Sequence, residues 1–218
     1  MPLILDIETV PLAASMDAPY PEAERTPPAN YKSEDAIARW RTADRAKWEQ
    51  DRAKECSLNP RLGRILCVGT SAGLWMAPTE ADEADVLRAA WDALATWEGQ
   101  VVTWNGAWDL RFILMRSLYH GIAPTIRPDV VSAWFRKYTY APHFDCKAVV
   151  LNWDVRVSGE GLSQWAEFLG VPGKLDGIGG ADVYPLYLGG QLEEIAAYCQ
   201  QDVAATKAIY ERLVPMFG

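Results

Sequence analysis

The chain has 218 residues, of which 50% are hydrophobic and 23% are charged, and this composition is typical of a globular protein rather than a disordered or collagen-like one. The net charge of −8 argues against a protein that coats duplex nucleic acid by bulk attraction, but not against an enzyme with a small basic groove. No apolar run reaches the length of a membrane span, and the N-terminus does not resemble a signal peptide. We therefore expect a cytoplasmic protein that does not contact the membrane.

The cysteines and histidines do not form a recognisable ligand pattern. Cys56, Cys67, Cys146 and Cys199 show no CxxC spacing, and the chain has only two histidines. We expect buried free thiols rather than a zinc site or a disulfide framework.

The chain opens with the apolar run "LILDIETVP", Leu3–Pro11, which contains two carboxylates two residues apart. Because successive side chains of a strand point to opposite faces, Asp6 and Glu8 share one face with Ile4. An ordinary strand that runs out into solvent explains the two acids as well as a functional site does. The remainder of the chain has to distinguish the two interpretations.

A proline-rich loop at Pro19–Pro28 is followed by a polar helix at Ser33–Glu55 with few apolar residues. Its basic and acidic residues are balanced, which favours a solvated or lid-like insertion over a DNA-binding arm. We expect a single domain over 1–218 that carries this loop-plus-helix insertion at about 12–55.

Strands and helices alternate after the insertion. The expected elements are two strands within Gly63–Pro78 joined by a turn at Ser71–Gly73, a strand at Gln100–Trp104, and helices at Asp82–Trp97, Gly106–Gly121, Gly161–Leu169 and Gln191–Leu213, with a less regular middle at Pro124–Gly161 and a glycine-rich loop between the last two helices. This order predicts an α/β fold with a mixed sheet flanked by helices. Sites in open α/β sheets form at the carboxyl ends of strands, where we expect Asp6 and Glu8 to lie.

The last helix has an aspartate within its apolar stripe. Asp202 occupies one position of the stripe, and Tyr198 lies one turn earlier on the same side. A buried aspartate is costly unless a cation or hydrogen bonds meet it. A structural aspartate bonded to a backbone group at the edge of the core remains the alternative. The apolar stripe consists of Leu192, Ile195, Cys199, Thr206, Ile209 and Leu213.

A fourth acid, Asp109, follows the strand at Gln100–Trp104. Helix capping alone explains its position in the first turn after that strand. Together with Asp6, Glu8 and Asp202, however, it forms a set of four carboxylates that would repel one another in one cleft unless divalent cations neutralised them. Ligation by oxygen alone suits Mg²⁺ or Mn²⁺.

Three motifs, "DIET" (Asp6–Thr9), "NGAWD" (Asn105–Asp109) and "YCQQD" (Tyr198–Asp202), resemble in order and spacing the motifs of the DEDD 3′→5′ exonucleases, which have a ribonuclease H-like fold. A tyrosine, Tyr198, lies four residues before the last aspartate, as in the DEDDy branch of this group. The chain therefore resembles that branch, which is similar to the proofreading domain of family-B DNA polymerases. Further similarity to stand-alone proteins of this group, at Leu58–Leu66 and Gly170–Val183, extends the resemblance over nearly the whole chain.

The resemblance implies a site with two ions of Mg²⁺ or Mn²⁺. Asp6 would bridge the ions, Glu8 and Asp202 would hold the first ion, and Asp109 would hold the second. Glu8 would also hold the attacking water, which the Tyr198 hydroxyl would orient, because an unperturbed tyrosine pKa is too high for a base at neutral pH.

The resemblance also implies that Thr9 and Asn105 contact the 3′ end of the substrate. Trp108 stands where such enzymes usually have Phe or Tyr, so it would shape the pocket for the terminal base. The implied activity removes nucleoside 5′-monophosphates from single-stranded DNA, with replication or repair proteins as partners.

Two alternatives remain open. The first is an RNA exonuclease on the same fold, which only contacts at the 2′-hydroxyl would distinguish. The second is a non-catalytic nucleic-acid-binding module, which the four acids disfavour because they repel phosphate.

The stretch "WFRKYTY", Trp134–Tyr140, has the mixture of basic and aromatic residues that binds single strands. A helix end with its aromatic residues turned inward explains that stretch equally well.

Overall fold

The computed structural model describes residues 1–154, 161–172 and 178–217. Its centre is a mixed five-stranded sheet in the order β3-β2-β1-β4-β5. β1 pairs antiparallel with β2 and parallel with β4, and β5 extends the parallel part. The strands are β1 (Leu3–Pro11), β2 (Gly63–Thr70), β3 (Gly73–Met76), β4 (Val101–Thr103) and β5 (His143–Asp145).

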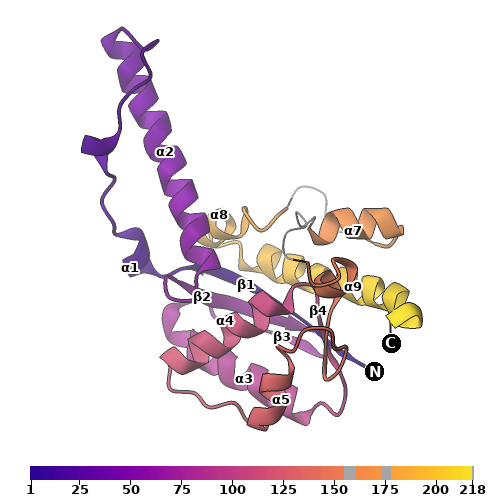
Figure 1. Ribbon diagram of the computed structural model, residues 1–218. Coiled ribbons are helices and arrows are strands. Elements are labelled where there is room, and N and C mark those ends of the chain that lie inside the picture. The colour runs from indigo at the N-terminus through magenta and orange to yellow at the C-terminus, as the bar shows by residue number, and fades with distance from the viewer. Residues whose placement is uncertain (155–160, 173–177, 218) are drawn as a thin grey trace.

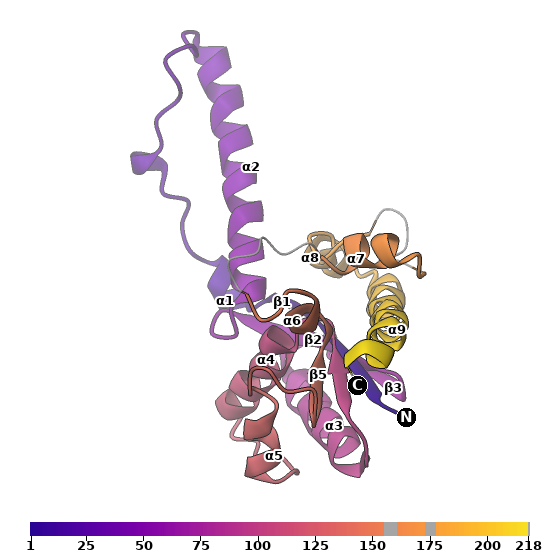
Figure 2. The same ribbon diagram turned by 45° about the vertical axis from the view of Figure 1, so that its right-hand side comes forward.

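Helices cover both faces of this sheet (Figures 1 and 2). α3 and α4 pack on one face, while α9 crosses the other face with α8 beside it. The sheet and its two helical layers confirm the predicted α/β architecture. The α-helices of the described residues are α1 (Ala13–Met16), α2 (Glu34–Leu58), α3 (Glu83–Thr96), α4 (Gly106–Tyr119), α5 (Pro128–Ala133), α6 (Cys146–Val150), α7 (Leu162–Leu169), α8 (Val183–Leu188) and α9 (Leu192–Phe217).

The central strand β1 is buried on both faces, and its side chains alternate between two cores. Leu3, Leu5 and Ile7 pack against α3 and α4, whereas Ile4 packs against the α9 side. The predicted alternation is therefore correct, and it turns the even-numbered Asp6 toward α9. The only irregularity in the pairing with β2 comes immediately after Glu8.

The insertion after β1 forms an arm (Figures 1 and 2). The segment before α2 runs outward from the sheet, and α2 returns alongside it to the sheet. The Ser33 hydroxyl caps α2 by accepting the Ala36 amide at 3.2 Å. The Tyr20 and Trp48 rings, 5.6 Å apart, hold the outgoing segment against the helix. The predicted polar helix is thus present, three residues longer at its C-terminal end.

The part of the chain expected to be irregular contains short elements that the sequence pattern does not predict. α5, β5 and α6 lie within the middle segment, and α8 occupies part of the expected glycine-rich loop. α9 also continues four residues beyond its expected end at Leu213, through Pro215. Residues 173–177 of the Gly170–Val183 stretch lie outside the described residues.

All four cysteines are buried free thiols, as predicted. Among the described residues, no helix combines the length and the apolarity needed to cross a membrane.

Candidate active site

Asp6 and Glu8 lie in the middle of β1 rather than at its end, so the prediction that they occupy a strand end is wrong. β1 continues along β2 as far as Pro11, but its parallel pairing with β4 stops at Ile4, opposite Val102. The two acids therefore lie just beyond the point where β4 ends. The carboxyl end that forms the site belongs to β4, and the space beside β1 is filled by the start of α4.

Helix α9 brings the third motif to these acids. The Cys199 Sγ lies 3.7 Å from the Asp6 Oδ2 atom, and ligand atoms of Asp6, Glu8 and Cys199 all lie within 4.8 Å of one another. A Cβ at Gly69 on β2 would lie 2.6 Å from the Cys199 Sγ. The absence of a side chain at Gly69 thus lets α9 approach the sheet at this position.

The interior face of α9 carries Tyr198 and Asp202, which are 2% and 6% exposed. Burial raises the pKa of Tyr198, and the negative charges of Glu8, Asp202 and Asp6 together with a hydrogen bond to Asp202 raise it further. The phenol therefore stays neutral over the physiological range. It can donate a hydrogen bond but cannot act as a base, in agreement with the role the sequence predicts for it.

Asp109 reaches the same cluster from α4 and is only 4% exposed. Burial raises the pKa of its carboxyl group well above the ordinary value, and the charges of Asp6 and Asp145 raise it further. Hydrogen bonds from backbone amides, including that of Ile7, oppose this shift without cancelling it. The predicted convergence of Asp109 with Asp6 is thus present in the structure.

Gly106 allows α4 to start where it does. A Cβ at this position would lie 2.3 Å from the Thr103 Oγ1 atom and 2.4 Å from the ring of His143. The first turn of α4 therefore sits directly against β4 and β5. This close contact places Asp109 one turn into the helix, beside β1.

A fifth carboxylate, Asp145, is a residue that sequence reasoning missed. It ends β5 and accepts the amides of Ala107 at 3.1 Å and Ala148 at 2.9 Å, so it binds the first turn of α4 and caps α6. Burial raises its pKa. The position of Asp145 before a helix could have indicated an N-cap. Its proximity to Asp109, however, depends on the pairing of β4 with β5, which no local pattern indicates.

Two residues predicted to contact the 3′ end are bonded to the base of the arm. The Thr9 hydroxyl donates to the Ser57 carbonyl oxygen at 2.7 Å, and the Trp108 Nε1–H donates to the Leu58 carbonyl oxygen at 3.2 Å. The last carbonyl groups of a helix lack partners within that helix. The end of α2 is therefore joined to two of the three predicted substrate contacts, a link that sequence reasoning did not anticipate.

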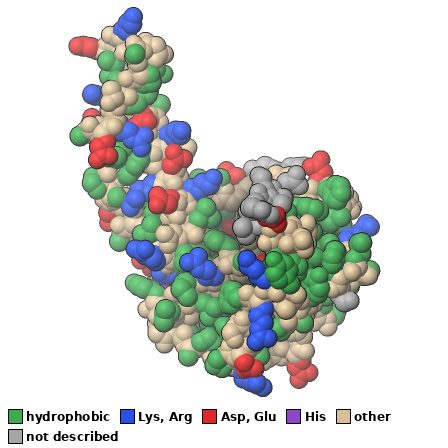
Figure 3. Space-filling view, viewed as in Figure 1, with side chains coloured by type: hydrophobic (Ala, Val, Ile, Leu, Met, Phe, Trp, Pro, Cys, Tyr) green, Lys and Arg blue, Asp and Glu red, His purple; other side chains and the backbone are tan. Residues whose placement is uncertain are grey.

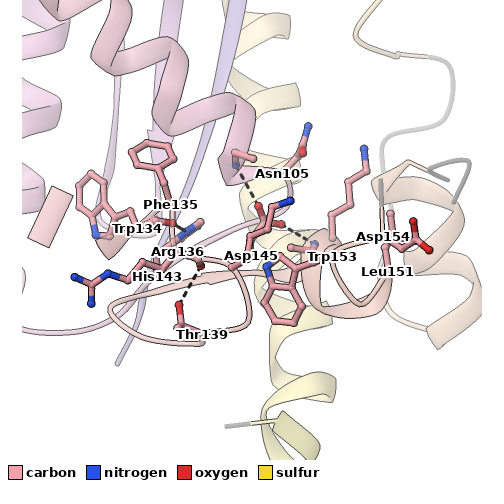
Figure 4. Close-up of a pocket in the computed structure, with 14 residues that line it drawn as sticks. Asn105, Trp134, Phe135, Arg136, Thr139, His143, Asp145, Leu151, Trp153 and Asp154 are labelled. Carbon is pink, nitrogen blue, oxygen red and sulfur yellow. Dashed lines mark hydrogen bonds between the residues drawn. The ribbon is translucent and has the colours of Figure 1, made fainter. Parts of the chain in front are cut away.

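The segment Trp134–Tyr140 follows the second interpretation of its sequence in part. Trp134 is turned inward and stacks on Trp91 with the ring centroids 6.1 Å apart. Trp134, Phe135, Arg136 and Lys137 line a cavity beside the start of α4 (Figure 4).

A sequence family of predicted 3′–5′ exonucleases related to the exonuclease domain of PolB matches residues 71–218. This match covers more than half of the chain. The chain belongs to this family. No curated protein matches it in sequence.

As a member of the PolB-related exonucleases, the protein is a nuclease that hydrolyses nucleic acid. The mixed sheet with helices on both faces is consistent with the ribonuclease H-like fold of such enzymes. The matched residues include Asn105–Asp109 and Tyr198–Asp202, whereas β1 precedes them. The fold, rather than the family match, brings Asp6 and Glu8 to the other two motifs.

PolB-like exonuclease domains generally use divalent metal ions, and this cluster fits such ions. Its carboxylates are hard oxygen donors. Burial and, after it, the charge of Asp6 raise the pKa of Asp109, and a bound cation would favour its ionised form. The Cys199 thiol lies in the same cluster. A hydrogen bond with Cys67, together with burial, raises the pKa of Cys199 well above its usual value in the metal-free protein.

Proposed function

We propose that the protein removes nucleoside 5′-monophosphates from the 3′ ends of single-stranded DNA with two ions of Mg²⁺ or Mn²⁺. The observation that supports this most strongly is that acids of β1 and α9 act on the neutral Tyr198 phenol, while Asp109 of α4 acts on Asp6. β1 and α9 come from opposite ends of the chain, and α4 comes from its middle. A binding module for phosphate would gain nothing from such a cluster, because like charges repel its ligand.

In this proposal Asp6 would bind both ions. Glu8 and Asp202 would bind the first ion, and Asp109 would bind the second. When bound, the ions would lower the pKa of the attacking water and neutralise charge on the phosphodiester. The carboxylates orient the ions, and the burial of three of them limits the competition from bulk water.

Tyr198 acts on the water rather than on the ions. Its raised pKa keeps the proton on the phenol, so its hydroxyl can hold the water in line with the phosphorus without removing a proton from it. Thr9, Asn105 and Trp108 surround the 3′-terminal nucleotide. Because Thr9 and Trp108 are bonded to the end of α2, the base of the arm sets their orientation.

The direct test compares single strands of DNA and RNA labelled at the 5′ or the 3′ end, with chelator, Mg²⁺ or Mn²⁺. We expect a ladder of shortened 5′-labelled DNA and immediate release of a labelled mononucleotide from 3′-labelled DNA, only with metal. If RNA is cleaved as fast as DNA, the substrate is single-stranded nucleic acid in general rather than DNA. Cleavage from the 5′ end would contradict the proposed 3′→5′ direction.

The matched variants for this test are Asp6→Asn and Asp92→Asn. Both remove one negative charge, but Asp92 is exposed on α3, away from the cluster. We expect Asp6→Asn to lose activity by at least a hundredfold and Asp92→Asn to retain it. Activity of Asp6→Asn above about 10% of wild type would remove Asp6 from the metal site.

The product of this reaction is a shortened strand with a 3′-hydroxyl, which is the end that a DNA polymerase extends. We therefore include cytoplasmic replication or repair proteins among its partners. A primer with a mismatched 3′ nucleotide tests this: trimming by the exonuclease should restore its extension by an added polymerase that lacks proofreading. Unchanged extension would argue against this role.

A further inference from the structure

A cavity of about 360 Å³ lies beside the acidic cluster, between the start of α4 and the segment that runs from α5 through β5 to α6 (Figure 4). Its volume is within the roughly 300–1,000 Å³ of small-molecule sites. It can accommodate a nucleotide but not a duplex. The roles proposed above for the acids and for Tyr198 do not use this cavity.

The cavity is continuous with the site. Asn105 lines it and also precedes the first turn of α4, which carries Asp109. The Asp145 carboxylate, another lining group, binds the Ala107 amide and raises the pKa of Asp109 by its charge. A strand whose 3′ end lies at the acids would therefore pass the cavity with its next nucleotides.

Basic side chains outnumber acidic ones in the cavity. Arg136, Lys137 and Lys147 line it together with the carboxylates of Asp145 and Asp154, in a chain whose net charge is −8. Within the described parts of the chain, no ion pair joins any of the three to a carboxylate. Exposed Lys and Arg side chains are visible along the arm and over the adjoining body in Figure 3. Arg136 and Lys137 are therefore available to phosphate groups, whereas the charge of Lys147 also acts on the Asp145 carboxylate.

Besides the buried Trp134, two more accessible aromatic rings border the same cavity. Phe135 is 42% exposed, although large apolar side chains are usually buried. Trp153 is half-buried and is held by the rings of Tyr138 and Tyr140 at 5.2 and 5.7 Å. Its indole is thus fixed at the cavity wall. Exposed rings beside cations are the combination that binds single-stranded nucleic acid, because every base has a π-face on which a ring can stack.

We propose that this cavity binds the nucleotides immediately upstream of the 3′-terminal one. A base stacks on Phe135 or Trp153, and Arg136, Lys137 and Lys147 hold the adjoining phosphates. The inference rests on the proposed exonuclease function and adds to it a requirement for a single strand longer than one nucleotide. The terminal nucleotide itself contacts the acids, Thr9 and Trp108 outside the cavity, and shares only Asn105 with it.

The test uses the double variant Arg136→Gln/Lys137→Gln and two substrates. One substrate is a single-stranded DNA of about ten nucleotides. The other is the p-nitrophenyl ester of thymidine 5′-monophosphate, which offers only the terminal nucleotide. The matched control, Arg88→Gln/Lys207→Gln, also removes two exposed positive charges, but from α3 and α9 outside the cavity. Both variants change exposed side chains, so we expect both to fold.

We expect the cavity variant to raise the KM for the oligonucleotide roughly tenfold, the effect of losing charge-assisted contacts. The slope of log KM against log salt should fall by about 1.4, which corresponds to two phosphates on a single strand. Hydrolysis of the ester should stay within twofold of wild type, and the control should match wild type on both substrates. An unchanged KM for the oligonucleotide, or an equal loss on both substrates, would overturn the inference.

The affinity for a fluorescently labelled single strand, measured in chelator, tests the contribution of the cavity to binding in the absence of cleavage. The cavity variant should bind about tenfold more weakly than wild type and the control. If wild type hydrolyses neither substrate, the proposed function fails. Even then, if the cavity variant binds the single strand more weakly than wild type and the control do, the strand binds in this cavity. Equal binding by all three proteins would refute the cavity assignment even in an active enzyme.

Discussion

Removing the charge of Asp109 should have opposite effects with and without metal. In the metal-free protein, its carboxylate is buried near Asp6 and Asp145, and its pKa is raised well above the ordinary value. A carboxyl group whose pKa is higher in the folded state destabilises the fold once it ionises, so the stability of metal-free protein should fall as the pH rises above about 4. Asp109→Asn should reduce this decline, to which Asp145 with its raised pKa also contributes, and should melt higher than wild type in chelator at neutral pH.

The metal should restore the stability of wild type. An ion that binds only the folded state at a hundred times its dissociation constant contributes about 2.7 kcal/mol. For a chain of 218 residues, the usual unfolding entropy converts this into a rise in melting temperature of about 6 °C. Asp109→Asn removes one ligand charge, so its metal-induced rise should be less than half of this value.

The assay is a thermal melt of wild type, Asp109→Asn and the exposed-site control Asp92→Asn at pH 5 and pH 8, in chelator and in millimolar Mn²⁺. The control should follow wild type in every condition. An equal metal-induced rise in wild type and Asp109→Asn would refute the reasoning, because the buried carboxylate would then contribute nothing to a metal site.

Three further changes probe separate contacts. Tyr198→Phe should slow turnover of single-stranded DNA roughly tenfold to a thousandfold while leaving the metal-induced rise in melting temperature unchanged, and wild-type turnover would remove the hydroxyl from the reaction. Glu83→Gln should lower the melting temperature by roughly 10 °C, because it leaves the buried Arg116 guanidinium, now 2.6 Å from Glu83, without its counter-charge. Burial raises the pKa of Glu83, but hydrogen bonds from Arg116, His120 and the Ile65 amide outweigh this effect and hold the pKa below its usual value. The difference in melting temperature between wild type and Glu83→Gln should therefore shrink below about pH 4 and stay constant above it. Thr9→Val should cost about 1 kcal/mol, or about 2 °C, by leaving the Ser57 carbonyl without its hydroxyl donor, and an unchanged melt would show that water replaces that bond.

Local pattern was enough to predict the long elements and the faces on which the motif acids lie. The alternation in Leu3–Pro11 placed Asp6 and Glu8 on one face, and the periodicity of the last helix showed that Asp202 points inward. Both predictions depend only on the repeat of a strand or a helix and on the cost of burying a charge. Such information is contained within a dozen neighbouring residues.

The meeting of these segments was decided by tertiary structure. β5 has only three residues and exists because it pairs with β4, so no periodicity marks it, yet it brings Asp145 to Asp109 and forms one wall of the cavity. The bonds from Thr9 and Trp108 to the end of α2 join residues about fifty positions apart. Contacts of this kind depend on which backbone groups remain without partners after the sheet and helices have packed, and that is a property of the whole fold rather than of any local stretch of sequence.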